Sequence, residues 1–312
     1  MPNEQSMKGR VIKSTGSWYI VRSEEGLVFE CRIKGKFRLN KSKLTNPVAV
    51  GDIVFFEIEE KETGQGIIHR IEERTNYLMR RSNKLSSQFQ IIASNVDFIL
   101  LLATIARPRT TTIFIDRILL AAEAYQIPVI LIFNKKDIYT EEENIILDEY
   151  RLMYESIGYE VMVLSAFDKA DIESLKVPIE NKISLITGHS GAGKSTIMNQ
   201  LNPLLSLKTG KLSNYHERGT HNTTFAEMHY VSDNTYIIDT PGIKDFGVVE
   251  FEKDNISMYF RDIRKFAGLC KFNNCTHIDE PGCQVINALK SGDLYLSRYE
   301  SYLNIILSLQ NT

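Results

Sequence analysis

The residue types that could hold a phosphate group occur together in one stretch: Gly188, His189, Ser190, Gly191, Ala192, Gly193, Lys194, Ser195 and Thr196. A strand-like run at 182–187 precedes this stretch, and a helix-like run follows it and ends at Asn202-Pro203. The glycines let successive backbone N–H groups turn toward an anion, and the helix adds its positive end. The pattern predicts a phosphate loop in which Lys194 reaches the β- and γ-phosphates and Ser195 ligates Mg²⁺.

A second motif, Asn134-Lys135-Lys136-Asp137, would select the base. It follows the apolar run 129–133, so we expect it at the C-terminal end of a buried parallel strand, where α/β sheets bind ligands. The Asp137 carboxylate can accept hydrogen bonds from two donors of guanine that adenine lacks. We expect the Lys135 stem to lie along the base and Asn134 to tie this loop to the phosphate loop.

Ser165-Ala166 follows the next predicted strand, 160–164, and the Ala166 N–H could donate to guanine O6. Asp239-Thr240-Pro241-Gly242 follows the strand-like run 235–238. There, Asp239 would hold Mg²⁺ through water and the Gly242 N–H would sense the γ-phosphate. These segments, with the phosphate loop, predict a site for guanine nucleotides and Mg²⁺.

The polar segment 219–224 would complete the catalytic site. Thr223 is our expected additional Mg²⁺ ligand, with Thr224 as the alternative. Where other GTPases carry a Gln that orients water, this chain has Ile243, whose apolar side chain cannot. His221 is therefore the candidate to orient the attacking water, the alternative being a group supplied by a partner.

The order of these motifs differs from that of Ras-like GTPases, in which the phosphate loop comes first. Here the guanine loops at 134 and 165 precede the phosphate loop at 188, so the chain is circularly permuted. The chain then leaves the nucleotide domain directly after 239–242, which predicts that the following segment responds to the nucleotide state.

A third set of residues predicts a metal centre: Cys270, Cys275, His277 and Cys283. Three thiolates and one imidazole within 14 residues suffice for a closed tetrahedral zinc site. Because no coordination position stays open, we expect one structural zinc. Clustered cysteines that bind a metal also indicate a reducing, cytoplasmic location.

The N-terminal part contains five strand-like runs, at 9–13, 17–23, 27–33, 53–59 and 66–72, which fit an OB-like β-barrel. Residues 1–84 carry 16 Lys or Arg against 11 Asp or Glu, although the whole chain has a net charge of −2. The positive charge is concentrated in Arg32, Lys34, Lys36, Arg38, Lys41 and Lys43. This asymmetry predicts a surface that faces RNA, and the run 74–84 reads as a basic linker.

The permuted motif order, the segment 219–224 and the cysteine cluster together resemble the ribosome-small-subunit-dependent GTPase A (RsgA/YjeQ) family over essentially the whole chain. Two positions depart from the family pattern: Thr220, where Arg is common, and Asn222, where Thr is common. The resemblance implies rRNA contact by the OB domain and supports a catalytic role for His221. It also implies GTP hydrolysis stimulated by the small (30S) ribosomal subunit, late in the maturation of that subunit.

The expected architecture is multidomain: an OB-fold domain with its linker at 1–84, a permuted α/β GTPase domain at 85–248, and a zinc-binding helical domain at 249–312. Helical runs are expected at 112–126, 141–157, 284–290 and 293–309. No apolar run approaches the ~20 residues that span a bilayer, and we expect a monomer. Two alternatives are a GTP-gated RNA-binding protein independent of the ribosome and a zinc-delivery GTPase.

Overall fold

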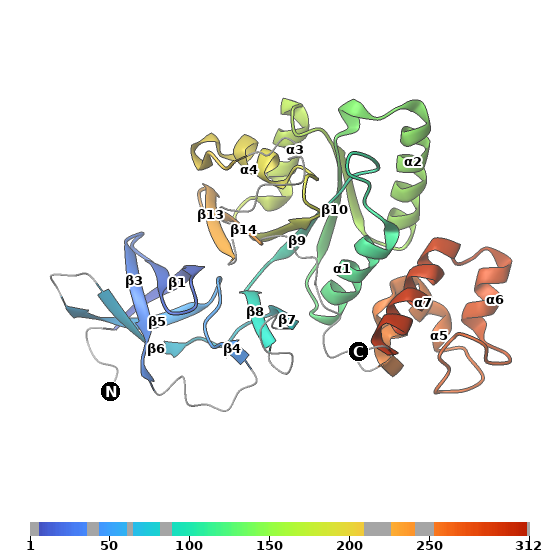
Figure 1. Ribbon diagram of the computed structural model, residues 1–312, viewed down its shortest axis with the longest axis horizontal. Coiled ribbons are helices and arrows are strands. Elements are labelled where there is room, and N and C mark those ends of the chain that lie inside the picture. Colours follow the sequence, from blue (N-terminus) through green and yellow to red (C-terminus); the bar gives the residue numbers. More distant parts are fainter. Residues whose placement is uncertain are drawn as a thin grey trace, which may run out of the picture.

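The computed structural model describes residues 6–35, 44–60, 65–81, 89–208, 226–240 and 253–310. Three regions follow one another along the chain: an N-terminal barrel, a central α/β unit and a C-terminal helical unit (Figure 1). In this described part of the chain, no helix is both long and apolar enough to cross a membrane.

The N-terminal region is a closed five-stranded barrel, which confirms the OB-like expectation. Its strands are β1 (Met7–Ser14), β2 (Tyr19–Ser23), β3 (Val28–Ile33), β5 (Ile53–Glu60) and β6 (Gln65–Ile71). They pair in the order β1-β2-β3-β6-β5, and β5 pairs again with β1 to close the barrel. Alternate residues point inward, and Val11, Tyr19, Val21 and Phe56 are among those that fill the interior.

A small separate sheet combines one strand from within the barrel sequence with two strands that follow the barrel. It consists of β4 (Leu44–Asn46), β8 (Phe89–Ser94) and β7 (Tyr77–Arg81), in that order. The sequence pattern predicted no strand in the run 74–84, whereas residues 77–81 of that run form β7. The alternating pattern of β7 is weak because Leu78 is its only fully buried residue among those whose burial is described.

The central unit has a mostly parallel sheet in the order β11-β10-β9-β12-β14-β13, of which only β13 runs antiparallel. The strands are β9 (Phe98–Ala103), β10 (Val129–Asn134), β11 (Glu160–Leu164), β12 (Ile183–Gly188), β13 (Glu227–Ser232) and β14 (Thr235–Asp239). All residues of β9, β10 and β12 are buried, as expected for strands covered on both faces.

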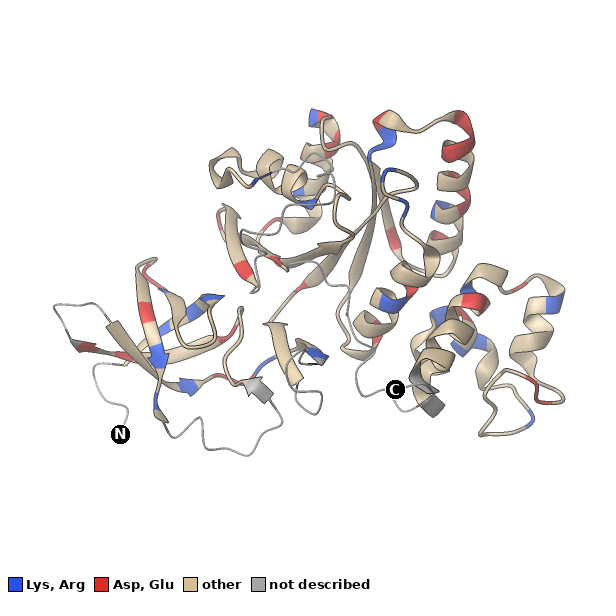
Figure 2. Ribbon diagram, in the orientation of Figure 1, with Lys and Arg blue, Asp and Glu red and all other residues tan. Residues whose placement is uncertain are grey.

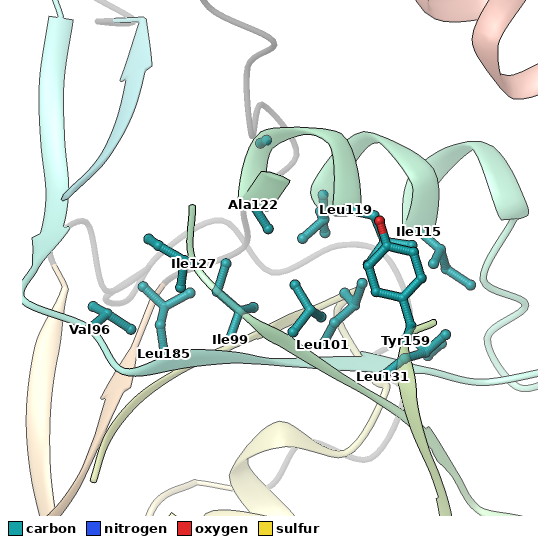
Figure 3. Close-up of a cluster of buried hydrophobic side chains, with 14 of the residues drawn as sticks. Val96, Ile99, Leu101, Ile115, Leu119, Ala122, Ile127, Leu131, Tyr159 and Leu185 are labelled. Atoms are coloured by element: carbon teal, nitrogen blue, oxygen red, sulfur yellow. The ribbon is translucent and has the colours of Figure 1, made fainter. Parts of the chain in front are cut away.

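Helices cover both faces of this sheet. On one face lie α1 (Thr112–Ala124) and α2 (Glu141–Ser156), and on the other α3 (Lys169–Ile179) and α4 (Lys194–Leu201). Figure 3 shows Ile115, Leu119 and Ala122 of α1 above Ile99 and Leu101 of β9. The helix predicted at 141–157 begins at the expected capping box of Thr140 and Glu143. Short 3₁₀ segments follow β10 and α4, as η2 (Lys136–Ile138) and η3 (Pro203–Leu205).

The C-terminal unit is helical and packs against α1. It contains η4 (Lys253–Tyr259), α5 (Arg261–Ala267), α6 (Gln284–Ser291) and α7 (Leu296–Gln310). The sequence predicted α6 and α7 but not α5. Its core, which includes Phe260, Ile263, Tyr302 and Ile305, also incorporates Leu120 of α1.

Candidate nucleotide and metal sites

The phosphate loop connects β12 to α4, as its sequence pattern predicts. Gly193 caps α4 in the left-handed region, with φ 104°. A Cβ at Gly193 would lie 2.2 Å from Asn134 Nδ2, and one at Gly188 would lie 2.3 Å from the Leu102 carbonyl oxygen. A side chain at either position would therefore clash with a neighbouring strand or loop, so the loop needs both glycines.

Lys194 and Asp239 bring opposite charges to this loop. Lys194 Nζ donates to the carbonyl oxygens of Gly188 (2.8 Å) and His189 (2.9 Å). Burial lowers the pKa of Lys194, and the Asp239 carboxylate opposes that shift. Burial also raises the pKa of Asp239, although the Lys194 charge acts in the other direction.

Asp239 Oδ1 is buried and has no hydrogen-bond partner within the described ranges. Ser195, the second residue of α4, provides a hydroxyl at the start of the helix. Hard oxygen donors of this kind suit Mg²⁺, which takes few protein ligands and keeps several waters. The unpaired carboxylate oxygen fits the expected Mg²⁺ environment.

Asn134 joins the three loops of the predicted guanine site. Its Nδ2 donates to the Ala192 carbonyl oxygen of the phosphate loop (2.8 Å), and its Oδ1 accepts from the Ala166 N–H (3.1 Å). The expected tie between Asn134 and the phosphate loop is therefore present. The Ala166 N–H, which we expected to donate to guanine O6, donates to Asn134 here.

Lys135 and Asp137 lie on the loop after β10. Lys135 has a left-handed backbone, with φ 72°, and its ammonium donates to the Arg107 carbonyl oxygen. Burial and the nearby Arg107 charge lower the pKa of Lys135. Asp137 lies in η2 and is exposed, so its carboxylate is accessible to a base.

Two contacts at this site were not predicted. The rings of His189 and Phe114 stack with centroids 3.8 Å apart, so α1 packs against the phosphate loop. Asp171 accepts hydrogen bonds from Lys136 and from the Ser165 N–H. The His189–Phe114 and Asp171–Lys136 contacts join residues far apart in the chain, so neither has a local sequence signal.

Several predicted site residues lie outside the residues that the structure describes. They are His221, Thr223, Thr224, Gly242 and Ile243. The same is true of Lys36, Arg38, Lys41 and Lys43 of the basic segment. Of that segment, Arg32 is described and pairs with Glu59, and Figure 2 shows acidic as well as basic residues on the barrel strands.

The four predicted metal ligands lie together. The Sγ atoms of Cys270, Cys275 and Cys283 and a ring nitrogen of His277 are all within 4.8 Å of one another. His277 Nδ1 lies 3.5 Å from both Cys270 Sγ and Cys283 Sγ. Soft thiolates and an imidazole at these separations fit a tetrahedral zinc ion, so the cluster could hold one.

The loop that carries the cluster is fixed by its neighbours. Tyr299 donates to the His277 carbonyl oxygen and Tyr302 to that of Thr276, both at 2.8 Å. Burial raises the pKa of Glu280, but hydrogen bonds from Thr276 and from backbone N–H groups outweigh it and lower the pKa to about 2. The hydrogen bonds of Tyr299 and Tyr302 connect the loop that carries the four predicted metal ligands to α7.

Two family profiles match the chain: "RsgA N-terminal domain" over residues 8–68 and "RsgA GTPase" over residues 71–249. The small ribosomal subunit biogenesis GTPase RsgA of Christiangramia forsetii is 49% identical, over 96% of each protein. The crystal structure of YjeQ from Thermotoga maritima matches with a TM-score of 0.79 and 30% identity, over 98% of this chain and 99% of that one. YloQ, described as a circularly permuted GTPase, matches with a TM-score of 0.74 and 27% identity, over 99% and 97%. Motifs, fold and relatives agree, and the chain belongs to the RsgA GTPase family.

Proposed function

We propose that this protein hydrolyses GTP to GDP and phosphate, that the small ribosomal subunit stimulates the reaction, and that it acts late in the maturation of that subunit. One observation carries the nucleotide part: Asn134 hydrogen-bonds both the phosphate loop and the Ser165-Ala166 loop, so the three predicted contact regions converge. The names of the relatives support the ribosomal part.

Different residues bind the guanine base, the phosphates and Mg²⁺. Asp137 accepts from guanine, Lys135 covers the base, and Ser165 and Ala166 border O6. The loop from Gly188 to Thr196 surrounds the phosphates, and the Gly242 N–H contacts the γ-phosphate. Bound Mg²⁺ would neutralise developing phosphate charge, with Ser195, Thr223 and Asp239 as its protein environment.

Hydrolysis also needs a positioned water. Lys194 balances charge on the β- and γ-phosphates, and His221, as a neutral imidazole, orients the attacking water. Because Ile243 cannot orient the water, turnover is slow in the absence of the small subunit and rises when the subunit is bound.

The other regions serve docking. We propose a division into 1–84, 85–248 and 249–312, with the small sheet of β4, β8 and β7 spanning the first junction. The barrel and the basic segment contact rRNA, and one structural zinc at Cys270, Cys275, His277 and Cys283 stabilises the C-terminal unit. The protein acts as a monomer in the cytoplasm.

Asp137→Asn tests the guanine assignment. It removes the acceptor for two guanine donors, so GDP affinity should fall by about 30-fold. Xanthosine diphosphate should bind better, because its C2 carbonyl accepts from the new amide. Titration calorimetry with GDP, ADP and xanthosine diphosphate measures this, and Asp148→Asn on the exposed face of α2 is the matched control. Equal affinity of the unmodified protein for ADP and GDP would refute the assignment.

A further inference from the structure

The Asp171 carboxylate connects the two loops to which the proposed function assigns guanine recognition. Its Oδ1 accepts from Lys136 Nζ at 2.7 Å, and its Oδ2 accepts from the Ser165 N–H at 2.7 Å. Lys136 directly precedes Asp137, and Ser165 directly precedes Ala166. One carboxylate thus holds the residue next to each predicted base contact.

Asp171 is itself held rigidly. It lies in the first turn of α3, where the helix dipole favours a negative charge, and Asp168 caps that helix by accepting from the Ala170 and Asp171 N–H groups. The α3 residues Ile172 and Leu175 are buried against the sheet. Asp171 therefore ties the loop of Lys136 and the loop of Ser165 to the fixed position of α3.

The hydrogen bonds of Asp171 to Lys136 and to the Ser165 N–H differ in how much each stabilises the loops. Lys136 is 37% exposed, so its ion pair is screened by water and contributes little. The Asp171 side chain is only 15% exposed, and its bond to a backbone N–H is charge-assisted. The Ser165 contact should therefore dominate.

We propose that Asp171 is a positioning residue for guanine selectivity. It fixes the Asp137 loop and the Ser165-Ala166 loop at the separation that a guanine base requires. This inference rests on the proposed function, because it assumes that both loops contact the base.

The test compares GDP with inosine diphosphate, which lacks the guanine 2-amino group. Asp171→Ala should weaken GDP about tenfold and inosine diphosphate less, so that the ratio of their dissociation constants moves toward one. Asp171→Asn keeps an acceptor for the Ser165 N–H and should recover most of the affinity. Lys136→Met should change GDP affinity only about twofold.

Glu173→Ala is the matched control, because Glu173 lies on α3 and pairs with Lys176 at the surface. It should leave both affinities unchanged. Wild-type values for Asp171→Ala, or an equal loss of both nucleotides, would overturn the inference. If Asp137→Asn still shifts selectivity in that case, the proposed function survives; if Asp137→Asn has no effect either, the proposed function fails with it.

Discussion

Asp239 and Lys194 carry opposite charges at the phosphate loop. Burial shifts the pKa of each side chain toward its neutral form, although each charge partly opposes the shift of the other. Burial outweighs the attraction of Lys194 and keeps the pKa of Asp239 above its ordinary value. The ionised carboxylate therefore costs stability before any ligand binds. A site prepared for Mg²⁺ and phosphate is expected to carry such a cost.

Asp239→Asn should stabilise the protein in the absence of nucleotide and Mg²⁺ by about 1 kcal/mol at pH 7. Because the folded pKa of Asp239 is raised, its penalty is absent below the unfolded value of about 3.9 and appears as pH rises through the folded pKa. The gain should therefore shrink as pH is lowered toward 4. Urea unfolding at several pH values measures it, and a loss of stability at pH 7 would contradict this reading.

Residue roles were predictable where the motif itself fixes the geometry. Asn134 follows a buried strand, so its position at the sheet edge, and its contact with the phosphate loop, could be expected from the pattern. Asp171 could not, because its partner Lys136 is 35 residues away and the contact depends on where α3 packs. The alternation rule also missed β7, in which Leu78 is the only fully buried residue with described burial.

At the scale of elements, α1 links the phosphate loop to the C-terminal unit. Phe114, in its first turn, stacks on His189, and Asp116 accepts a hydrogen bond from Arg298 of α7. Arg298 also forms a bidentate pair with Asp262 of α5, at 2.9 and 3.0 Å. Helix α1 therefore contacts both the phosphate loop and the C-terminal unit directly.

Arg298→Met should destabilise the C-terminal unit by about 3–5 kcal/mol. The Arg298 side chain is 1% exposed, and its loss would leave the Asp116 and Asp262 carboxylates buried without their cation. Arg264→Met, at an exposed position of α5, is the control and should have little effect. Hydrogen exchange in α5 and α7 reports the change, and unaltered exchange would show that the pair is dispensable.

The metal loop permits a separate prediction. Cys275→Ala should lower the zinc content from about one ion per chain to near zero and speed hydrogen exchange in the C-terminal unit. GDP affinity should change little, because the cluster lies outside the nucleotide site. Cys31→Ala, in the barrel core, should keep the zinc, so metal analysis of the two variants is decisive. Full zinc content in the Cys275 variant would show that the ligand set is wrong.

At the scale of the molecule, the barrel and the nucleotide domain share one sheet. Strand β1 of the barrel pairs with β13, and Lys13 and Glu227 form an ion pair at 3.0 Å across that junction. The β13–β14 hairpin follows the predicted catalytic segment 219–224 in the sequence and ends at Asp239, the first residue of the predicted segment 239–242. The β1–β13 pairing therefore connects the barrel to the hairpin that ends at Asp239, a residue of the proposed nucleotide site.

The strand pattern, the order of the nucleotide motifs and the cysteine cluster were enough to predict a barrel, a permuted α/β domain and a metal-binding helical region. They could not predict the β1–β13 pairing, because edge strands carry no sequence mark of their partner. The β1–β13 pairing depends on how the two domains assemble. It supports the proposal that docking on the small ribosomal subunit is coupled to GTP turnover.

The rate of GTP hydrolysis with and without purified small ribosomal subunits tests the central claim most directly. We expect slow turnover alone and a rise of about 100-fold or more with small subunits, with much less stimulation by large subunits or free RNA. His221→Ala should remove most of that rise while preserving GTP affinity. An unchanged rate with small subunits, or equal stimulation by large subunits, would contradict the account.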